Sequence, residues 1–129
     1  MPGDLPTNAL QSRLREFASS REWDKFHTPK NLAMALAGEA GELLEVFQWL
    51  TPEESRQLSS DPVGQSRVAA ELADILIYAL RMADVLGVDL AAAVSSKIEL
   101  NETRYPIDYA RGNARKYTER ATQRRPERR

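Results

Sequence analysis

The chain lacks cysteine and contains one histidine among its 129 residues. Without cysteine it forms no disulfide and offers no thiolate ligand, and one histidine cannot build a multi-histidine zinc site within one subunit. Any bound metal is therefore expected on oxygen ligands. Long apolar runs are also missing, because acidic residues interrupt them, and the first twenty residues do not follow the pattern of a signal peptide. We expect a cytoplasmic protein without a membrane segment.

Charge is unevenly distributed along the chain. Residues 1–110 hold ten basic and seventeen acidic side chains, whereas residues 111–129 hold eight basic and two acidic ones. Basic tails of this composition usually stay solvated and disordered, so contact with nucleic acid is not favoured. The length fits a single domain. We predict a folded domain over residues 1–110 and a disordered basic tail over residues 111–129.

Strand patterns are scarce, and signals for the start of a helix are frequent. Thr28-Pro29, Thr51-Pro52 and Asp61-Pro62 each pair a capping side chain with proline at the first helical position, and Glu54 completes a capping box with Thr51. Thr7 is a further candidate cap. The sequence predicts an all-α bundle of four main helices plus a short connecting helix, over residues 8–20, 29–50, 52–58, 63–86 and 90–104.

The segment 63–86 is apolar around nearly its whole circumference, which is typical of a buried helix. One short chain can barely cover such a helix, so we expect a homo-oligomer. Its polar side chains fall in one narrow stripe, for which two interpretations stay open: a solvent-exposed face with an Arg67–Glu71 ion pair, or a functional face. The stripe consists of Arg67, Glu71, Asp74, Tyr78 and Arg81.

Acidic residues on the segment 29–50 favour the functional interpretation. Glu39 and Glu42 are neighbours at i,i+3, and no Lys or Arg occurs between Lys30 and Arg56. Like charges held this close need a cation or a proton. Together with Glu71 and Asp74 on a neighbouring helix, they predict a site for one or two hard cations, Mg²⁺ or else Mn²⁺.

Two other classes of metal site do not fit the pattern. A ferritin-like di-iron centre needs Glu-x-x-His on two helices, and the one histidine, His27, lies outside both helices. A calcium-binding EF-hand needs a loop of alternating acids around a glycine, which the sequence lacks. The acidic pairs therefore favour magnesium chemistry inside a bundle.

Basic and polar residues on the segment 90–104 indicate what the cation is for. Lys97, Asn101 and Arg104 stand at i, i+4 and i+7 on the apolar side of this helix, so we expect them to face inward. The alternative is that Lys97 and Arg104 extend to solvent from the bundle's edge. Carboxylates, a cation and basic side chains in one pocket favour a polyphosphate substrate, held without a glycine-rich phosphate loop.

Aromatic residues lie at the two ends of the segment 29–50. Trp49 lies about two turns beyond Glu42 on the same side, and Trp23, Phe26 and His27 precede the helix. Aromatic side chains at helix ends usually pack in the core or between subunits, and stacking on a nucleotide base is the functional alternative.

Three segments, "FHTPKNLAMALAGEAGELLEVFQWL", "ELADILIYAL" and "SSKIELNETRYP", resemble the all-α MazG-like nucleoside triphosphate pyrophosphatases, most closely the dCTP pyrophosphatase branch. The resemblance covers about residues 8–106. The family motif often opens with two consecutive Glu, where this chain has Gly38-Glu39. The resemblance implies that Mg²⁺ is bound by Glu39, Glu42, Glu71 and Asp74, that phosphate or sugar is met by Lys97, Asn101 and Tyr105, and that the nucleotide pocket is lined by His27, Trp49 and Tyr78.

The resemblance also implies the reaction and the assembly. A nucleoside triphosphate, with dCTP and 5-modified dCTP as the best candidates, would be hydrolysed to monophosphate and pyrophosphate in nucleotide-pool house-cleaning. The base would be a carboxylate within hydrogen-bond reach of the attacking water, Glu42 or Glu45. Glu45 is outside the pattern shared with the family, and the sequence does not choose between the two. The implied assembly is a tetramer built as a dimer of dimers. A non-catalytic nucleotide- or metal-binding bundle and a protein-interaction module stay open as alternatives.

Overall fold

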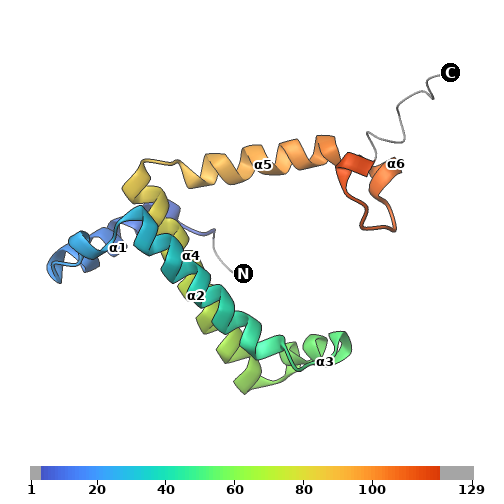
Figure 1. Cartoon of the computed structure of the whole chain (residues 1–129), viewed down its shortest axis with the longest axis horizontal. Coiled ribbons are helices and arrows are strands. Elements are labelled where there is room, and N and C mark those ends of the chain that lie inside the picture. The colour runs from blue at the N-terminus through green and yellow to red at the C-terminus, as the bar shows by residue number, and fades with distance from the viewer. Residues whose placement is uncertain (1–3, 120–129) are drawn as a thin grey trace. The chain divides into compact units, whose positions relative to one another are not determined.

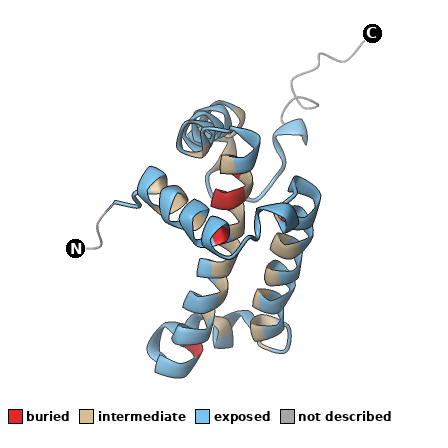
Figure 2. Cartoon of the chain, turned by 90° about the vertical axis from the view of Figure 1, so that its left-hand side faces the viewer, coloured by how far each residue is buried: buried red, intermediate tan, exposed pale blue. Residues whose placement is uncertain are grey.

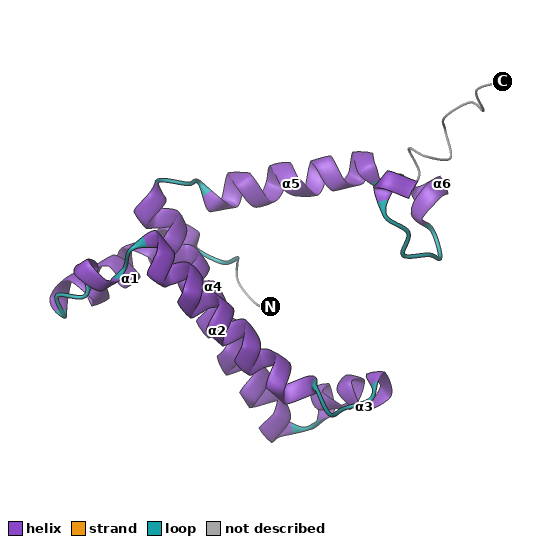
Figure 3. Cartoon of the chain, viewed as in Figure 1, coloured by secondary structure: helices purple, strands orange, loops and turns teal. Residues whose placement is uncertain are grey.

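The fold of the described chain is entirely helical. The computed structural model describes residues 4–119, and among these no residue is in a strand (Figure 3). The five helices predicted from the sequence are present, so the all-α class is confirmed. In chain order the elements are α1 (Thr7–Ser20), the short 3₁₀ turn η1 (Asp24–Phe26), α2 (Pro29–Phe47), α3 (Pro52–Arg56), the 3₁₀ turn η2 (Gln57–Ser60), α4 (Pro62–Leu86), α5 (Leu90–Arg104) and α6 (Ile107–Ala110).

The predicted capping residues start three of these helices. The Thr28 hydroxyl accepts a hydrogen bond from the Asn31 amide before α2, and the Asp61 carboxylate accepts one from the Val63 amide before α4. Thr51 and Glu54 form the predicted capping box before α3. The prediction for Thr7 is wrong, because Thr7 is already helical and α1 begins without a side-chain cap.

Residues 1–90 form one compact unit of the chain. In this unit α2 and α4 lie side by side, and α1 packs against α4 (Figure 1). Few of its side chains are buried, as the scarcity of red in Figure 2 shows. The single chain does not cover segment 63–86 on all sides. Six large apolar residues of α4 remain exposed: Val63, Leu72, Leu76, Ile77, Val85 and Leu86.

Residues 91–129 form the second unit. Residues 91–103 of α5 are all exposed, so the inward orientation predicted for Lys97 and Asn101 is not observed in the single chain. After α6 the chain returns to α5: the Tyr117 ring lies 6.0 Å from the Tyr105 ring, and the Arg104 guanidinium lies 4.4 Å from the Tyr117 ring centre. Contacts therefore continue into the segment assigned to the tail, of which residues 120–129 lie outside the described residues.

A helix that crosses a bilayer must be long and strongly apolar. None of the helices within residues 4–119 combines the necessary length with sufficient apolar character.

Candidate active site

Three carboxylates meet where α2 packs against α4. Glu39 and Glu42 of α2 and Glu71 of α4 each bring one carboxylate oxygen within 4.8 Å of the others. The i,i+3 spacing places Glu39 and Glu42 on one face of α2. Asp74 lies one turn beyond Glu71, and its charge acts on both Glu39 and Glu71. The structure thus brings together three of the four acids that the sequence predicts as metal ligands, and Asp74 is outside this group. We call Glu39, Glu42 and Glu71 the acidic cluster.

The acidic cluster is electrostatically strained without a counter-charge. The pKa of Glu39 is raised to about 7, first by loss of hydration and then by hydrogen bonds with Glu42 and Glu71 and by the charges of Glu42 and Asp74. Burial is also the main cause of the raised pKa of Glu71. Within residues 4–119 no Lys or Arg forms an ion pair with the cluster, so the Arg67–Glu71 pair of the solvent-face interpretation is not formed.

Two buried oxygens of the cluster have unused hydrogen-bonding capacity. The Oε2 atoms of Glu39 and Glu71 are shielded from solvent, and neither has a hydrogen-bond partner among the described residues. A buried acceptor without a partner is costly, whereas a divalent cation with oxygen ligands would satisfy both oxygens and the clustered charge. The donor set therefore fits a hard cation such as Mg²⁺.

A pocket of about 420 Å³ adjoins these acids. Asp74 lines it and also interacts electrostatically with the acidic cluster. The Trp23 ring stands edge-on to Phe17 at 5.6 Å and to His27 at 6.3 Å. This wall gives flat apolar surface beside a few polar groups, as ligand pockets commonly do. We call it the aromatic pocket; its lining residues are Leu14, Phe17, Trp23, His27, Asp74, Ile77, Tyr78 and Arg81.

Arg81 holds one side of the aromatic pocket. Its side chain is 8% exposed, and its Nε donates to Nδ1 of His27 at 3.1 Å. Nη2 donates to Asp24 at 2.7 Å and Nη1 to Asp84 at 3.3 Å. The sequence placed Arg81 in a stripe that one interpretation exposed to solvent, and for Arg81 that interpretation is wrong. The sequence indicated a role for Arg81 in the site only through its position on the same helix face as Asp74 and Tyr78.

Trp49 and His27 lie at opposite ends of α2. His27 precedes the helix and Trp49 follows it, and 19 helical residues span about 28 Å at 1.5 Å per residue. Trp49 is 86% exposed and is not among the residues that line the aromatic pocket. His27 and Tyr78 do line it together. The two predicted pocket residues His27 and Trp49 therefore cannot enclose the same base within one chain.

The model of the MazG-like family matches residues 35–119, which include both acidic pairs and all of α5. The chain belongs to the MazG-like family. The resemblance expected from the three sequence segments is thereby confirmed.

Several proteins similar to this MazG-like chain are named as pyrophosphatases. It is 47% identical to human dCTP pyrophosphatase 1 and 45% identical to the mouse protein of the same name, in each case over 104 residues. These alignments cover 81% of the chain and 61% of either relative, so the chain spans about three fifths of their length. A solved structure of a pyrophosphatase from Archaeoglobus fulgidus superposes with a TM-score of 0.70 at 42% identity, covering 82% of this chain and 97% of that one.

The remaining predicted residues of the MazG-like chain lie outside the acidic cluster. Glu45 is exposed on α2, one turn beyond Glu42. Lys97 and Asn101 are exposed on α5, whereas Arg104 and Tyr105 contact Tyr117. Their contacts with a substrate stay predictions. The sequence predicted no site role for Phe17 or Asp24, and it indicated Trp23 and Arg81 only as members of an aromatic group and of a polar stripe.

Proposed function

We propose that this MazG-like protein is a Mg²⁺-dependent pyrophosphohydrolase that converts a deoxynucleoside triphosphate into the monophosphate and pyrophosphate. One observation carries the proposal: Asp74, whose charge acts on Glu39 and Glu71 of the acidic cluster, also lines the aromatic pocket. A triphosphate needs a cation for its phosphates and a flat surface for its base, and this arrangement offers both side by side. The names of the relatives support the same reaction class.

The proposed cation ligands are Glu39, Glu42, Glu71 and Asp74, with Mn²⁺ as a possible substitute for Mg²⁺. When bound, the cation would polarise the phosphate oxygens and lower the pKa of a water ligand. The carboxylates hold the negative charge that fixes the cation beside the pocket. Either Glu42 or Glu45 accepts the proton of the attacking water. Glu42 belongs to the acidic cluster and Glu45 does not. Separate Glu42→Gln and Glu45→Gln variants therefore distinguish the loss of a cation ligand from the loss of a base.

The proposed substrate contacts divide between base and phosphates. Trp23 and Tyr78 supply aromatic surface for the base, and His27 supplies a polar group beside them. Lys97, Asn101 and Tyr105 contact the phosphates or sugar, as the family resemblance implies, and Arg104 joins them because it shares the stripe of Lys97 and Asn101. Two positive charges on α5 suit a triphosphate because they offset the charge that the cation leaves uncompensated.

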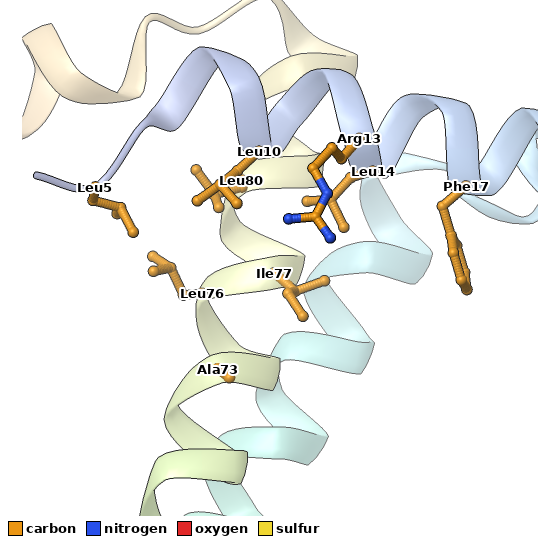
Figure 4. A pocket seen from close by; sticks show the side chains of 9 residues that line it. All are labelled: Leu5, Leu10, Arg13, Leu14, Phe17, Ala73, Leu76, Ile77 and Leu80. Atoms are coloured by element: carbon orange, nitrogen blue, oxygen red, sulfur yellow. The ribbon is translucent and has the colours of Figure 1, made fainter. Parts of the chain in front are cut away.

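We also propose that the functional form is a homo-oligomer, specifically a tetramer built as a dimer of dimers. Apolar side chains of α1 and α4 surround an open hollow of about 460 Å³, with Arg13 at its edge (Figure 4). A second copy, which carries the same exposed apolar α4, is its proposed occupant. The oligomer would also give Trp49 a role in binding the base. Trp49 cannot reach the aromatic pocket of its own chain, but it could line the aromatic pocket of a second copy. A cytoplasmic location stays a prediction.

The substrate assignment is tested with a panel of triphosphates. The values of kcat/KM for dCTP, 5-methyl-dCTP, CTP, dTTP, dUTP and dATP are compared in Mg²⁺. We expect dCTP and its 5-modified form to lead. Equal values for dCTP and dATP would contradict the cytosine assignment, and CTP equal to dCTP would contradict the preference for deoxyribose. The absence of turnover with every triphosphate would favour a non-catalytic binding protein.

A further inference from the structure

The hydrogen bond between Arg81 and His27 restricts the chemical state of the histidine. A guanidinium donates hydrogen bonds and cannot accept them, so Nδ1 of His27 must present its lone pair to Nε of Arg81 at 3.1 Å. A proton on Nδ1 would point at the Nε–H group of Arg81. A ring protonated on both nitrogens would in addition place its positive charge beside that of the guanidinium. His27 is therefore neutral, and its one ring proton is on Nε2.

Arg81 is itself fixed from several directions. Its side chain is 8% exposed and binds Asp24 before α2 and Asp84 one turn along α4. Asp84 is held in turn by Arg15 of α1, at 3.0 Å from Nε and 2.6 Å from Nη2. A planar guanidinium with three separate acceptors has little freedom to turn, so the ring that it binds is also oriented.

Nε2 is the polar group of His27 that remains available to the aromatic pocket. Among residues 4–119 no group forms a hydrogen bond with it, and His27 lines the pocket beside Trp23 and Tyr78. The charged and titratable groups around the ring are Arg81, Asp24, Asp74 and Tyr78. Loss of hydration, followed by the charge of Arg81, lowers the pKa of His27, which agrees with the neutral ring required by the hydrogen bond.

We propose that Arg81 is a positioning residue that fixes His27 as a neutral Nε2–H donor, and that this donor binds an acceptor on the base of the substrate. The acceptor is a carbonyl oxygen or an unprotonated ring nitrogen, both of which cytosine presents on its edge. The donation to a ligand rests on the proposed function, whereas the state of the ring does not. The aromatic side chains can stack on any base, whereas this hydrogen bond has a fixed direction and can discriminate between bases.

The ring state is measured by NMR without any substrate. Because the chain has one histidine, protein labelled with ¹⁵N-histidine gives one pair of ring nitrogen signals. At pH 7 we expect a protonated Nε2 and an unprotonated Nδ1 that accepts a hydrogen bond. The Arg81→Met variant should give a mixture of tautomers, and Arg56→Met, which removes an exposed guanidinium outside this network, should keep the wild-type pattern. A wild-type ring protonated on Nδ1, or on both nitrogens, would overturn the proposal.

Ligand donation is measured with dCMP, which requires no turnover. On saturation with dCMP we expect the Nε2 signal to shift and the Nδ1 signal to stay. An unchanged Nε2 signal, or no binding of dCMP, would overturn the ligand contact while leaving the ring state to the first experiment. A protein that binds dCMP in this way but hydrolyses no triphosphate would disprove the proposed function and support the inference.

Kinetics distinguish this role from a structural one. His27→Asn can accept from Arg81 but has no donor at the position of Nε2, whereas the longer His27→Gln can place an amide N–H there. We expect KM for dCTP to rise about tenfold in His27→Asn with kcat nearly unchanged, because a contact to the base is lost equally in ground and transition states. His27→Gln should recover most of the loss. Equal KM values for His27→Asn and wild type would contradict the contact, even if Arg81→Met fails to fold.

Discussion

Glu39 of α2 and Glu71 of α4 bring carboxylate oxygens within 4.8 Å of each other, and each retains a solvent-shielded Oε2 without a hydrogen-bond partner among the described residues. Loss of hydration raises the pKa of both side chains. Two acids in this state repel each other until a proton or a cation joins them. The packing of α2 against α4 therefore both stabilises the fold and holds the two carboxylates so close that they require a cation.

Removing one charge from the acidic cluster should abolish activity without unfolding the protein. We expect Glu71→Gln to lower kcat/KM by at least about a hundredfold, because the cation loses a charged ligand. Helix content by circular dichroism should be unchanged, and the melting temperature in EDTA should rise because the repulsion is relieved. Glu53→Gln, which removes an exposed acid of α3, is the matched control. Wild-type turnover of Glu71→Gln in limiting Mg²⁺ would disprove the four-carboxylate site.

The acidic cluster should make the stability of the metal-free protein depend on pH. Unfolded, Glu39 loses its proton near its ordinary pKa of 4.5, whereas in the fold it keeps the proton until about pH 7. Between these values the unfolded chain binds fewer protons, so the free energy of unfolding should fall as the pH rises. Denaturation in EDTA between pH 4.5 and 7.5 measures this slope. It should be smaller in Glu39→Gln and in excess Mg²⁺, and a flat wild-type profile would argue against the raised pKa.

Much of the acidic cluster was predictable because its signal is local. Two acids at i,i+3 with no basic residue between Lys30 and Arg56 are visible in one helix, and helical geometry places them on one face. The starts of α2, α3 and α4 were equally predictable from Thr28-Pro29, Thr51-Pro52 and Asp61-Pro62, since a cap depends on residues within one turn. Thr7 shows the limit of that signal, because the chain enters α1 through Pro6 without a side-chain cap. The helix ends were less predictable, because α2 ends at Phe47 and not at residue 50.

The role of Arg81 was not predictable because its partners are distant in sequence. Asp24 and His27 lie before α2, and they meet Arg81 only through the packing around α4. Helical periodicity gave Arg81 the correct stripe but not its burial. Periodicity likewise showed that segment 63–86 is apolar nearly all round, but it does not report how much of that surface the same chain covers.

The apolar hollow between α1 and α4 should mediate assembly. A charge placed there, as in Leu76→Glu, would have to be buried against the second copy, so we expect the mass in sedimentation to fall below that of the wild-type oligomer. Val63→Glu, at an exposed position outside the hollow, should keep the wild-type mass. A wild-type mass of one chain at micromolar concentration would contradict the oligomer, and an unchanged mass for Leu76→Glu would locate the interface elsewhere.

Two truncations separate the contacts of Tyr117 from the rest of the basic tail. A chain ending after Glu119 keeps the packing of Tyr117 on Arg104 and Tyr105, so its kinetics should match those of the full chain. A chain ending after Gly112 loses that packing, and KM for the triphosphate should rise because both side chains are proposed substrate contacts. Identical KM values for the two truncations would show that Tyr117 does not support the site.

The most direct measurement of the central claim is the identity of the phosphate product. Purified protein is incubated with dCTP in Mg²⁺, and pyrophosphate, orthophosphate, dCMP and dCDP are quantified, with Glu71→Gln as the inactive control and EDTA as the metal-free control. The account predicts equimolar pyrophosphate and dCMP, without orthophosphate, and loss of both products in either control. Release of orthophosphate with dCDP, or equal turnover in Glu71→Gln, would contradict it.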